Sequence, residues 1–454
     1  MLMMRVSKVL LLILSVVCAQ SVAENVTSIE LDSIDPEPID FSMIDPDTTN
    51  IGSYYYETIN MKVTSASDRF IVTLKPGVDV KTHVKFLEDI HALAISKRSD
   101  GQRFDGVSHQ YNIADFLAYA GHFEPTVIKQ LRDCQDVLSV EPDQLLTTKD
   151  LAHMEPRLSI PWQKPRRGLV KQEESPWGLH YISHKHDNHT NEHEYIYDRS
   201  SGTGTYAYIV DTGIWTKHSD FQGRASLGYN AIKTEQFSDT DGHGTFVASI
   251  VGGKYYGVAK KTNLIAVKVI GQNGTTASII IDGYIWAVNH IQRNNREAKA
   301  VINLSISTPR SEAFNRAVDA AFAAGITTVA AVGNQGISAQ SRSPASAEGC
   351  ITVAHTDQEY EVNRWANHGP EVDIFAPGTN VQGAGLGGKW NNDIMTGSSF
   401  AAPHVSGLVV YAKAMEILID ANSTKEWLLK NALPEMIFPS NGARNLFAYN
   451  GNGT

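Results

Sequence analysis

Apolar, strand-like segments alternate with helical segments over the last two thirds of this chain, and this alternation limits the fold more than any other feature. Strands are predicted at residues 205–210, 264–270, 300–306, 326–332 and 371–375, and helices at 245–251, 277–291, 312–324 and from 405 onward. Strands that are apolar on both faces and separated by helices indicate a parallel sheet covered by helices on both sides. Such α/β folds bind substrate at the carboxyl ends of their strands.

A smaller pattern precedes this one. Residues 70–74 predict a strand, 81–94 a helix, 106–121 a strand pair, 125–134 a helix and 137–140 a closing strand. The order β-α-β-β-α-β is that of a ferredoxin-like domain. We therefore expect a separate domain over residues 68–147.

The N-terminus has the features of a secretory signal. Residues 1–23 hold Arg5 and Lys8 before a short apolar run, and end in small residues. The acidic, proline-containing residues 24–67 are typical of a disordered extension. The apolar run in residues 1–23 is too short to cross a bilayer. We therefore expect a soluble chain that enters the secretory route and has no membrane partner.

The 454-residue chain has a net charge of −10, which argues against nucleic acid or an anionic membrane surface as partner. Residues 148–174 form a basic, proline-containing linker with an Arg166-Arg167 pair, and we expect processing there. Of the three cysteines, removal of Cys18 and Cys134 would leave Cys350 alone, so the domain at 175–454 is expected to lack a disulfide.

A glycine and two serines lead into the last apolar helix. Ser399, in the sequence Thr396-Gly397-Ser398-Ser399, is expected at the N-terminus of that helix. A hydroxyl there lies at the positive end of the helix dipole, which suits a nucleophile whose reaction builds negative charge. The alternative is a serine that only caps a core helix.

Three further polar residues follow strands or open a helix. Asp211 ends a predicted strand, His243 lies between glycines at a helix start, and Asn334 follows another strand. They suit a carboxylate that orients an imidazole, a general base and an oxyanion donor. Taken alone, each is also compatible with a purely structural residue in a turn or loop. An aspartic protease needs a second Asp-Thr-Gly or Asp-Ser-Gly besides the one at Asp211, and none occurs.

The order Asp211, His243, Asn334, Ser399 is that of the subtilisin triad with its oxyanion asparagine. The sequence resembles the subtilisin-like serine proteases, specifically the proteinase K branch. Within this branch, the sequence is most similar to the fungal alkaline proteases of the oryzin type, and the vacuolar protease cerevisin is a near second. The resemblance runs from Pro176-Trp177-Gly178-Leu179 to Asn450-Gly451 and includes Asp373-Ile374-Phe375-Ala376-Pro377-Gly378.

The resemblance implies a subtilisin-like catalytic domain and an inhibitory propeptide at residues 68–147. It implies a monomeric serine endopeptidase with broad specificity for proteins and peptides, made as a prepro-enzyme. The propeptide would act as intramolecular chaperone and inhibitor. Substrate-binding residues would be Gly274, Thr275, Ser305, Ile306, Ser307 and Gly333.

Two readings of the function stay open beside this one. Family members usually have glycine where this chain has Ser307, which puts the residue preferred before the scissile bond in doubt. An inactive subtilase-fold binding protein is one alternative, and a vacuolar rather than extracellular enzyme is the other.

No cofactor is expected for the chemistry. The resemblance implies a structural calcium ion at Asp373, with carbonyl ligands from around Glu348 and Cys350. Glycosylation sequons, which suit a secreted protein, occur at Asn25, Asn188, Asn273, Asn422 and Asn452.

Overall fold

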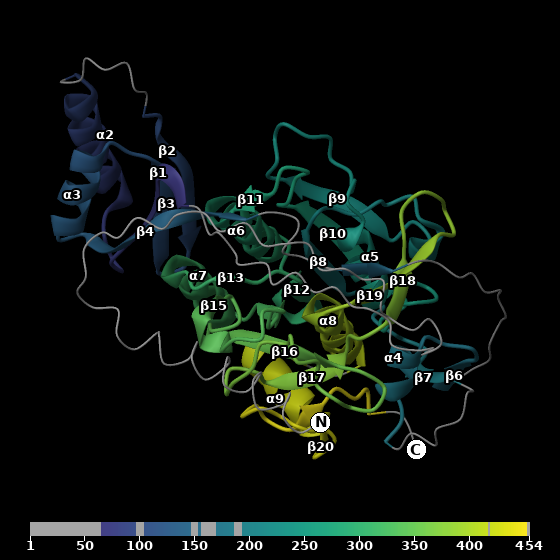
Figure 1. Cartoon of the computed structure of the whole chain (residues 1–454). Coiled ribbons are helices and arrows are strands. Elements are labelled where there is room, and N and C mark those ends of the chain that lie inside the picture. Colours follow the sequence, from purple (N-terminus) through teal and green to yellow (C-terminus); the bar gives the residue numbers. More distant parts are fainter. Residues whose placement is uncertain are drawn as a thin grey trace, which may run out of the picture. The chain divides into compact units, whose positions relative to one another are not determined.

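The computed structural model describes residues 65–96, 104–146, 153–155, 169–185, 193–415 and 418–451. The expected signal peptide (residues 1–23), almost all of the acidic extension (24–67) and most of the linker (148–174) lie outside these ranges. Figure 1 shows the described elements along the chain.

The N-terminal domain, residues 65–146, has the expected ferredoxin-like order. Its elements are β1 (Ser65–Leu74), α2 (Val80–Ser96), β2 (Gly106–Ile113), β3 (Phe116–His122), α3 (Pro125–Asp133) and β4 (Val137–Leu146). The strands form an antiparallel sheet in the order β4-β1-β3-β2. Val72 and Tyr119 pack against Leu87 of α2 and Leu131 of α3, so the two helices cover one face of this sheet.

The larger domain is built on a mostly parallel sheet, as the alternating pattern predicted. Among the described residues its strand order is β20-β21-β17-β16-β14-β12-β8-β10-β9. The inner strands are β8 (Tyr206–Asp211), β10 (Asn263–Lys268), β12 (Ala300–Leu304), β14 (Thr327–Ala331), β16 (Cys350–Thr356) and β17 (Ile374–Pro377). At the edges lie β9 (Ala225–Asn230), β21 (Leu446–Phe447) and the antiparallel β20 (Leu433–Pro434).

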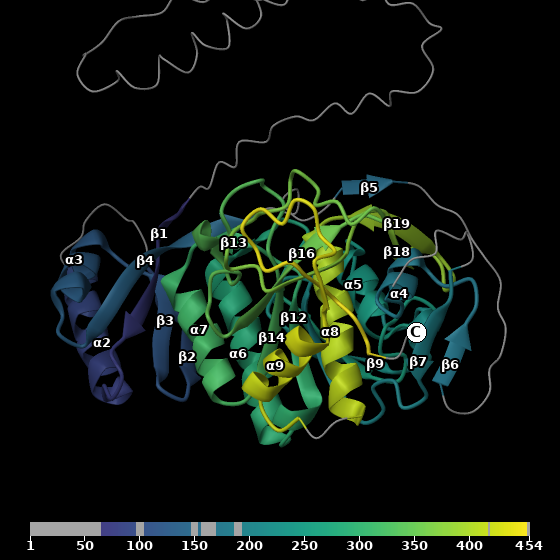
Figure 2. The ribbon, with the colours of Figure 1, turned by 90° about the horizontal axis from the view of Figure 1, so that it is seen from below.

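Helices cover both faces of this sheet. Alternate residues of a strand point to opposite faces, and in β8 Ile209 packs in the same core as α5 (His243–Gly252) and α8 (Ser398–Met415). Val210 packs in a second core with α6 (Ala277–Arg293) and α7 (Glu312–Ala323). Figure 2 shows α8 in front of the sheet and α6 and α7 toward the N-terminal domain.

The remaining elements are short and lie in the connections. They are α4 (Trp177–Tyr181), α9 (Ala421–Asn431), η3 (Ser219–Phe221), η4 (Glu297–Lys299), η5 (Ala339–Ser341), β5 (His153–Glu155), β6 (Leu169–Gln172), β7 (Tyr195–Asp198), β11 (Thr275–Thr276), β13 (Thr308–Pro309), β15 (Arg342–Ser343), β18 (Val381–Ala384) and β19 (Asn392–Thr396). β6 pairs with β7. Residues 169–172, which were expected in the linker, thus supply the strand that pairs with β7.

The second face of the N-terminal sheet packs on the larger domain. Ile71 and Tyr111 lie in one core with residues of α6 and α7, and the Tyr111 hydroxyl donates to the Ser278 carbonyl at 2.9 Å. In the part of the chain that the structure describes, no helix is both long enough and apolar enough to span a bilayer. Cys134 and Cys350 are both free thiols.

Candidate active site

Asp211 and His243 form a buried hydrogen-bonded pair. Asp211 is the last residue of β8, and His243 is the first residue of α5. His243 Nδ1 lies 2.8 Å from Asp211 Oδ1, and the two side chains are 3% and 0% exposed. Among the described residues, His243 Nε2 has no hydrogen-bond partner. A carboxylate on Nδ1 favours the tautomer that keeps the Nε2 lone pair available for a proton.

The turn before α5 explains how His243 reaches this position. Gly242 has φ +108°, a backbone conformation that favours glycine. Asp239 accepts hydrogen bonds from the Gly242 N–H at 2.9 Å and the Thr245 N–H at 2.9 Å. It also accepts from the Thr212 hydroxyl at 2.9 Å, which ties the helix to the residue after Asp211.

Asp239 was not identified from the sequence. The signal was present, since an aspartate shortly before a helix start is a common capping residue. Its second contact, to Thr212 after another strand, comes from the tertiary fold. Asp239 therefore connects the segment that follows Asp211 to the start of the helix that carries His243.

Surrounding carboxylates change the proton affinity of His243. Burial opposes protonation, but the charges of Asp211, Asp241 and Asp239 outweigh it and raise the pKa of His243 above its usual value. Burial also raises the pKa of Asp241. Asp241 is held close to His243, since its carboxylate accepts from the His243 backbone N–H at 3.2 Å.

Ser399 is the second residue of α8 and is 4% exposed. Its hydroxyl donates to the Ser305 carbonyl at 3.1 Å, while the Ser305 hydroxyl donates to the Ser399 carbonyl at 2.6 Å. Phe400, the next residue, has its ring 5.5 Å from that of His243, centroid to centroid. The start of α8 therefore lies beside the His243 end of α5.

Asn334 is joined to the same helix start. Its Oδ1 accepts from the Ser398 N–H and the Ser398 hydroxyl, each at 2.9 Å. These bonds orient the side chain, and its Nδ2 lies next to Gly397. A Cβ added at Gly397 would lie 3.0 Å from this nitrogen. The amide is thus held next to the start of α8, with its donor group facing the Gly397 turn that leads to Ser399.

The residues expected to bind substrate contact different parts of the chain. Ser305 and Gly333 contact the start of α8, the latter through its N–H to the Ser398 hydroxyl at 3.0 Å. Ser307 follows Ile306, whose side chain is 2% exposed and packs in the core, so only its backbone faces the site. Thr275 follows Gly274 and pairs with Leu146 at the end of β4.

The N-terminal domain also contacts the N-termini of two helices of the larger domain, α6 and α7. Asp143 accepts from the N–H and the hydroxyl of Ser278, at 3.0 and 2.6 Å, at the start of α6. Glu141 accepts from the Glu312 N–H at 3.0 Å and from the Ser311 hydroxyl at the start of α7. Carboxylates at helix N-termini satisfy unpaired N–H groups and the helix dipole.

The expected calcium site at Asp373 does not fit this structure. The ammonium group of Lys425, on α9, lies 3.0 Å from Asp373 Oδ2. It also donates to the Cys350 carbonyl at 2.7 Å and to the Glu348 carbonyl at 3.5 Å. These are the oxygens that the calcium prediction named. A positive charge already lies among them, so these oxygens do not fit a calcium ion while Lys425 occupies this position.

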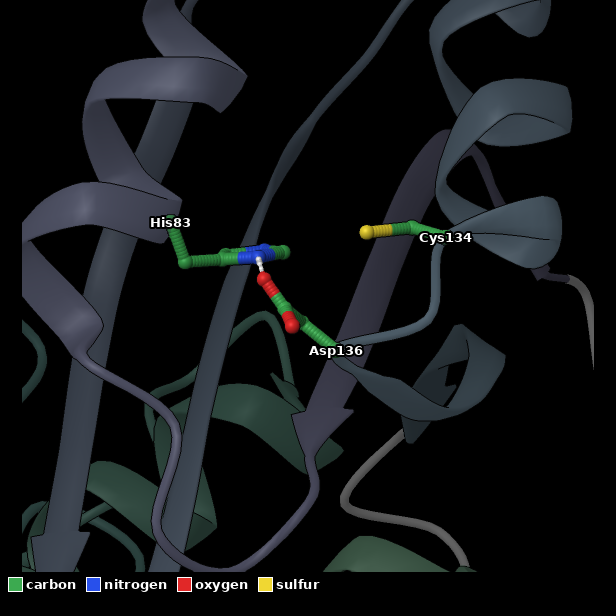
Figure 3. A group of neighbouring side chains, drawn as sticks. All are labelled: His83, Cys134 and Asp136. Atoms are coloured by element: carbon green, nitrogen blue, oxygen red, sulfur yellow. Dashed lines mark hydrogen bonds and ion pairs between the residues drawn. The ribbon is translucent and has the colours of Figure 1, made fainter.

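A second group of possible metal ligands lies in the N-terminal domain. His83, Cys134 and Asp136 bring one ligand atom each within 4.8 Å of one another (Figure 3). His83 Nδ1 lies 3.4 Å from Asp136 Oδ2, and Nε2 lies 3.1 Å from the Tyr119 hydroxyl. Because both ring nitrogens have protein partners, His83 serves to join α2 to β3 and to the turn before β4.

Comparison with known proteins agrees with this geometry. Residues 202–453 match the Subtilase family, and residues 69–149 match the peptidase inhibitor I9 family. The chain is a member of the subtilase family. It is 41% identical to an alkaline proteinase of Hapsidospora chrysogena over 85% of this chain and 92% of the relative. It is 40% identical to alkaline protease 1 of Aspergillus clavatus, over 84% and 91%.

A solved structure shares the fold. It is a cold-adapted subtilisin-like serine proteinase, with a TM-score of 0.56 and 29% identity over 61% of this chain and 98% of that chain. This subtilase is therefore a serine protease with an I9 propeptide, made as a precursor, and it acts on protein or peptide substrates. The resemblance to fungal alkaline proteases is confirmed. Subtilases need no cofactor for the hydrolysis itself.

Proposed function

We propose that the protein is a secreted, monomeric endopeptidase that uses Ser399 as nucleophile, His243 as general base and acid, and Asp211 to orient His243. The hydrogen bond from His243 Nδ1 to the buried Asp211 carboxylate is the observation that carries this assignment. It leaves Nε2 as the nitrogen that takes the Ser399 proton and returns it to the leaving amine.

The oxyanion that forms on the substrate carbonyl would be bound by Asn334 Nδ2 and the Ser399 N–H. Asn334 is held by Ser398 before substrate arrives, so no reorientation is needed as charge develops. Such a fixed donor acts mainly on the transition state, which raises kcat more than it lowers KM.

Substrate would bind as an extended strand. The Gly274–Thr275 edge already pairs with β4 of the N-terminal domain, at Thr275 with Leu146. β5 pairs with β19, at Thr396 with His153, and β19 leads directly into the Ser399 turn. Main-chain pairing of this kind recognises backbone rather than particular side chains, which supports substrates of varied sequence.

The same two pairings support self-inhibition by the N-terminal domain. β4 pairs with the Gly274–Thr275 edge, and β5, which follows later in the same chain, pairs with β19. A substrate would need both edges. Cleavage between residues 148 and 174, at the site itself or after Arg166-Arg167, would release them. The ordered strand β6 begins at Leu169, soon after that arginine pair.

The decisive experiment compares the natural chain with Ser399→Ala in a secreting host. The natural chain should lose its N-terminal domain and hydrolyse casein, and a serine-directed inactivator should stop the hydrolysis. Ser399→Ala should remain a full-length precursor without activity. Ser341→Ala, which changes an exposed serine, should behave like the natural chain.

The alternatives predict other outcomes. A natural chain that is folded and processed by other proteases, yet does not hydrolyse casein, would be an inactive binding protein. Casein hydrolysis that survives in Ser399→Ala would refute the assigned nucleophile. Activity that fractionates with vacuoles instead of the culture medium would leave the mechanism intact and correct only the location.

A further inference from the structure

A buried lysine ends the strand next to that of Asp211. Lys268 is the last residue of β10, pairs in register with Asp211 of β8, and is 1% exposed. Its ammonium group donates to the Thr212 carbonyl and to the Ile270 carbonyl, each at 2.9 Å. It also lies 3.3 Å from Glu235 Oε2. The ammonium group, which has three donors, thus has three oxygens within reach.

Glu235 connects this lysine to a short turn, residues 271–274, which we call the edge turn because it leads into the Gly274–Thr275 edge. Its second oxygen, Oε1, accepts from the Gln272 backbone N–H at 2.7 Å. Glycine at 271 allows this approach, because a Cβ added there would lie 2.5 Å from Oε1. One carboxylate therefore joins a buried ammonium group to the backbone of the edge turn, and a hydrogen bond to a charged group is stronger than a neutral one.

The edge turn is closed by its own backbone. The N–H of Gly271 donates to the Gly274 carbonyl at 3.2 Å, and the N–H of Gly274 donates to the Gly271 carbonyl at 3.0 Å. Gly274 has φ +91°, which favours glycine. Thr275 follows directly and pairs with Leu146 of the N-terminal domain. A displacement of the edge turn would therefore move the edge on which an extended substrate is proposed to bind.

The backbone of Glu235 is itself held against β10. Its N–H donates to the Ile232 carbonyl at 3.1 Å, and its carbonyl accepts from Asn230 Nδ2 at 3.0 Å. The Ala231 N–H donates to the Lys268 carbonyl at 2.8 Å. The loop that carries Glu235 is thus attached to the same residue whose ammonium group faces the carboxylate. This gives the carboxylate a fixed position from which it holds the edge turn.

We propose that Glu235 is a positioning residue for substrate binding. Its carboxylate, which faces Lys268, holds the edge turn so that the Gly274–Thr275 edge is in place before a peptide binds. The inference rests on the proposed function, which assigns that edge to the substrate. An edge that is already ordered loses less conformational entropy when it binds, so affinity is higher. Glu235 acts through the turn and not on the reacting atoms.

This role predicts which kinetic constant depends on Glu235. Main-chain pairing at the edge is made in the bound substrate and in the transition state alike. Loss of such uniform binding raises KM and leaves kcat nearly unchanged. A substrate too short to pair with the edge should not depend on Glu235, because it gains nothing from the order of the edge.

The test uses the processed enzyme and two substrates. One is a peptide with four residues before the scissile bond, and the other is an ester of a single blocked amino acid, which is too short to pair with the edge. Glu235→Ala should raise KM for the peptide about 10-fold, the size of one lost hydrogen bond to a charged group, with little change in kcat. Both constants for the ester should stay the same. Gln236→Ala, which changes the exposed neighbour of Glu235, should change neither substrate's constants.

Glu235→Gln gives a second measurement, which decides the matter if Glu235→Ala does not fold. Its amide oxygen can still accept from the Gln272 N–H but carries no charge to face Lys268, so KM for the peptide should rise less, and only for the peptide. An unchanged KM for the peptide in the variants that fold would overturn the inference. So would a loss that appears equally with the ester, or that appears in kcat. Hydrolysis that Ser399→Ala retains would instead refute the proposed function.

Discussion

The active site and the Asp373 region are both charged, buried clusters next to the same sheet, yet they differ in where their partners come from. In the active site, residues that follow strands or open helices meet because the fold brings those ends together. At Asp373, the charge is balanced by Lys425 on a helix near the C-terminus. The ends of strands and helices thus bring the proposed catalytic groups together, whereas a metal site depends on every side chain that can reach it.

The first prediction tests the active-site half of this comparison. Asn334→Ala should lower kcat by about 10²–10³-fold, because one oxyanion donor is lost, with a much smaller change in KM. Steady-state kinetics on a peptide substrate measure both constants. Asn431→Ala, on α9, serves as control. A loss as large as that of Ser399→Ala in correctly folded protein would argue that Asn334 does more than bind the oxyanion.

The second prediction tests the Asp373 half. Lys425→Met should lower the free energy of unfolding by about 1–3 kcal/mol, because Asp373 and two carbonyls lose their cation. Millimolar calcium should restore part of this loss, since a hard cation suits the same oxygens. Thermal unfolding measures both effects, and kcat should change little.

Two controls make that result specific. Lys430→Met, which changes an exposed lysine of the same helix, should leave stability unchanged. The natural enzyme should unfold at the same temperature with calcium and with a chelator. If a chelator destabilises the natural enzyme as much as it does Lys425→Met, the lysine does not replace a metal ion at this site.

The third prediction concerns the smaller electrostatic effect around His243. Nearby carboxylates raise the pKa of His243, and a general base must be unprotonated, so kcat/KM should fall as pH drops through a value above that of an ordinary histidine. Asp241→Asn removes one of those charges. The pKa of His243 should then decrease, and the acidic limb of the pH profile should move to lower pH.

The measurement is the pH dependence of kcat/KM in both proteins. Asp282→Asn, on α6, removes a charge outside the active site and should leave the limb in place. A shift of the limb to higher pH in Asp241→Asn would contradict the assigned role of the Asp241 charge.

Much of the fold, and the positions of the proposed catalytic residues at the ends of strands and helices, could be predicted because the signals are local. Apolar runs bounded by glycines predicted the inner strands, and each proposed catalytic residue lies near such a boundary. The contacts that were missed join distant segments. Lys425 bonds a carbonyl 75 positions away, and Arg342 bonds a serine 35 positions away. No periodicity or short motif reports such pairs, because they form only when packed elements meet.

The strands β4 and β5 pair with two different segments of the larger domain, β11 and β19, and belong to one chain. If the proposed self-processing occurs, the bond that is cut belongs to the same molecule as the site, and its effective concentration does not depend on how dilute the protein is. Cleavage of that bond in each molecule would follow first-order kinetics, with a half-time unchanged by dilution. After the cut, the N-terminal domain is no longer covalently joined to the larger domain, so its rebinding becomes a bimolecular event. A precursor would therefore mature at low protein concentration, and the processed enzyme would stay active when it is diluted further.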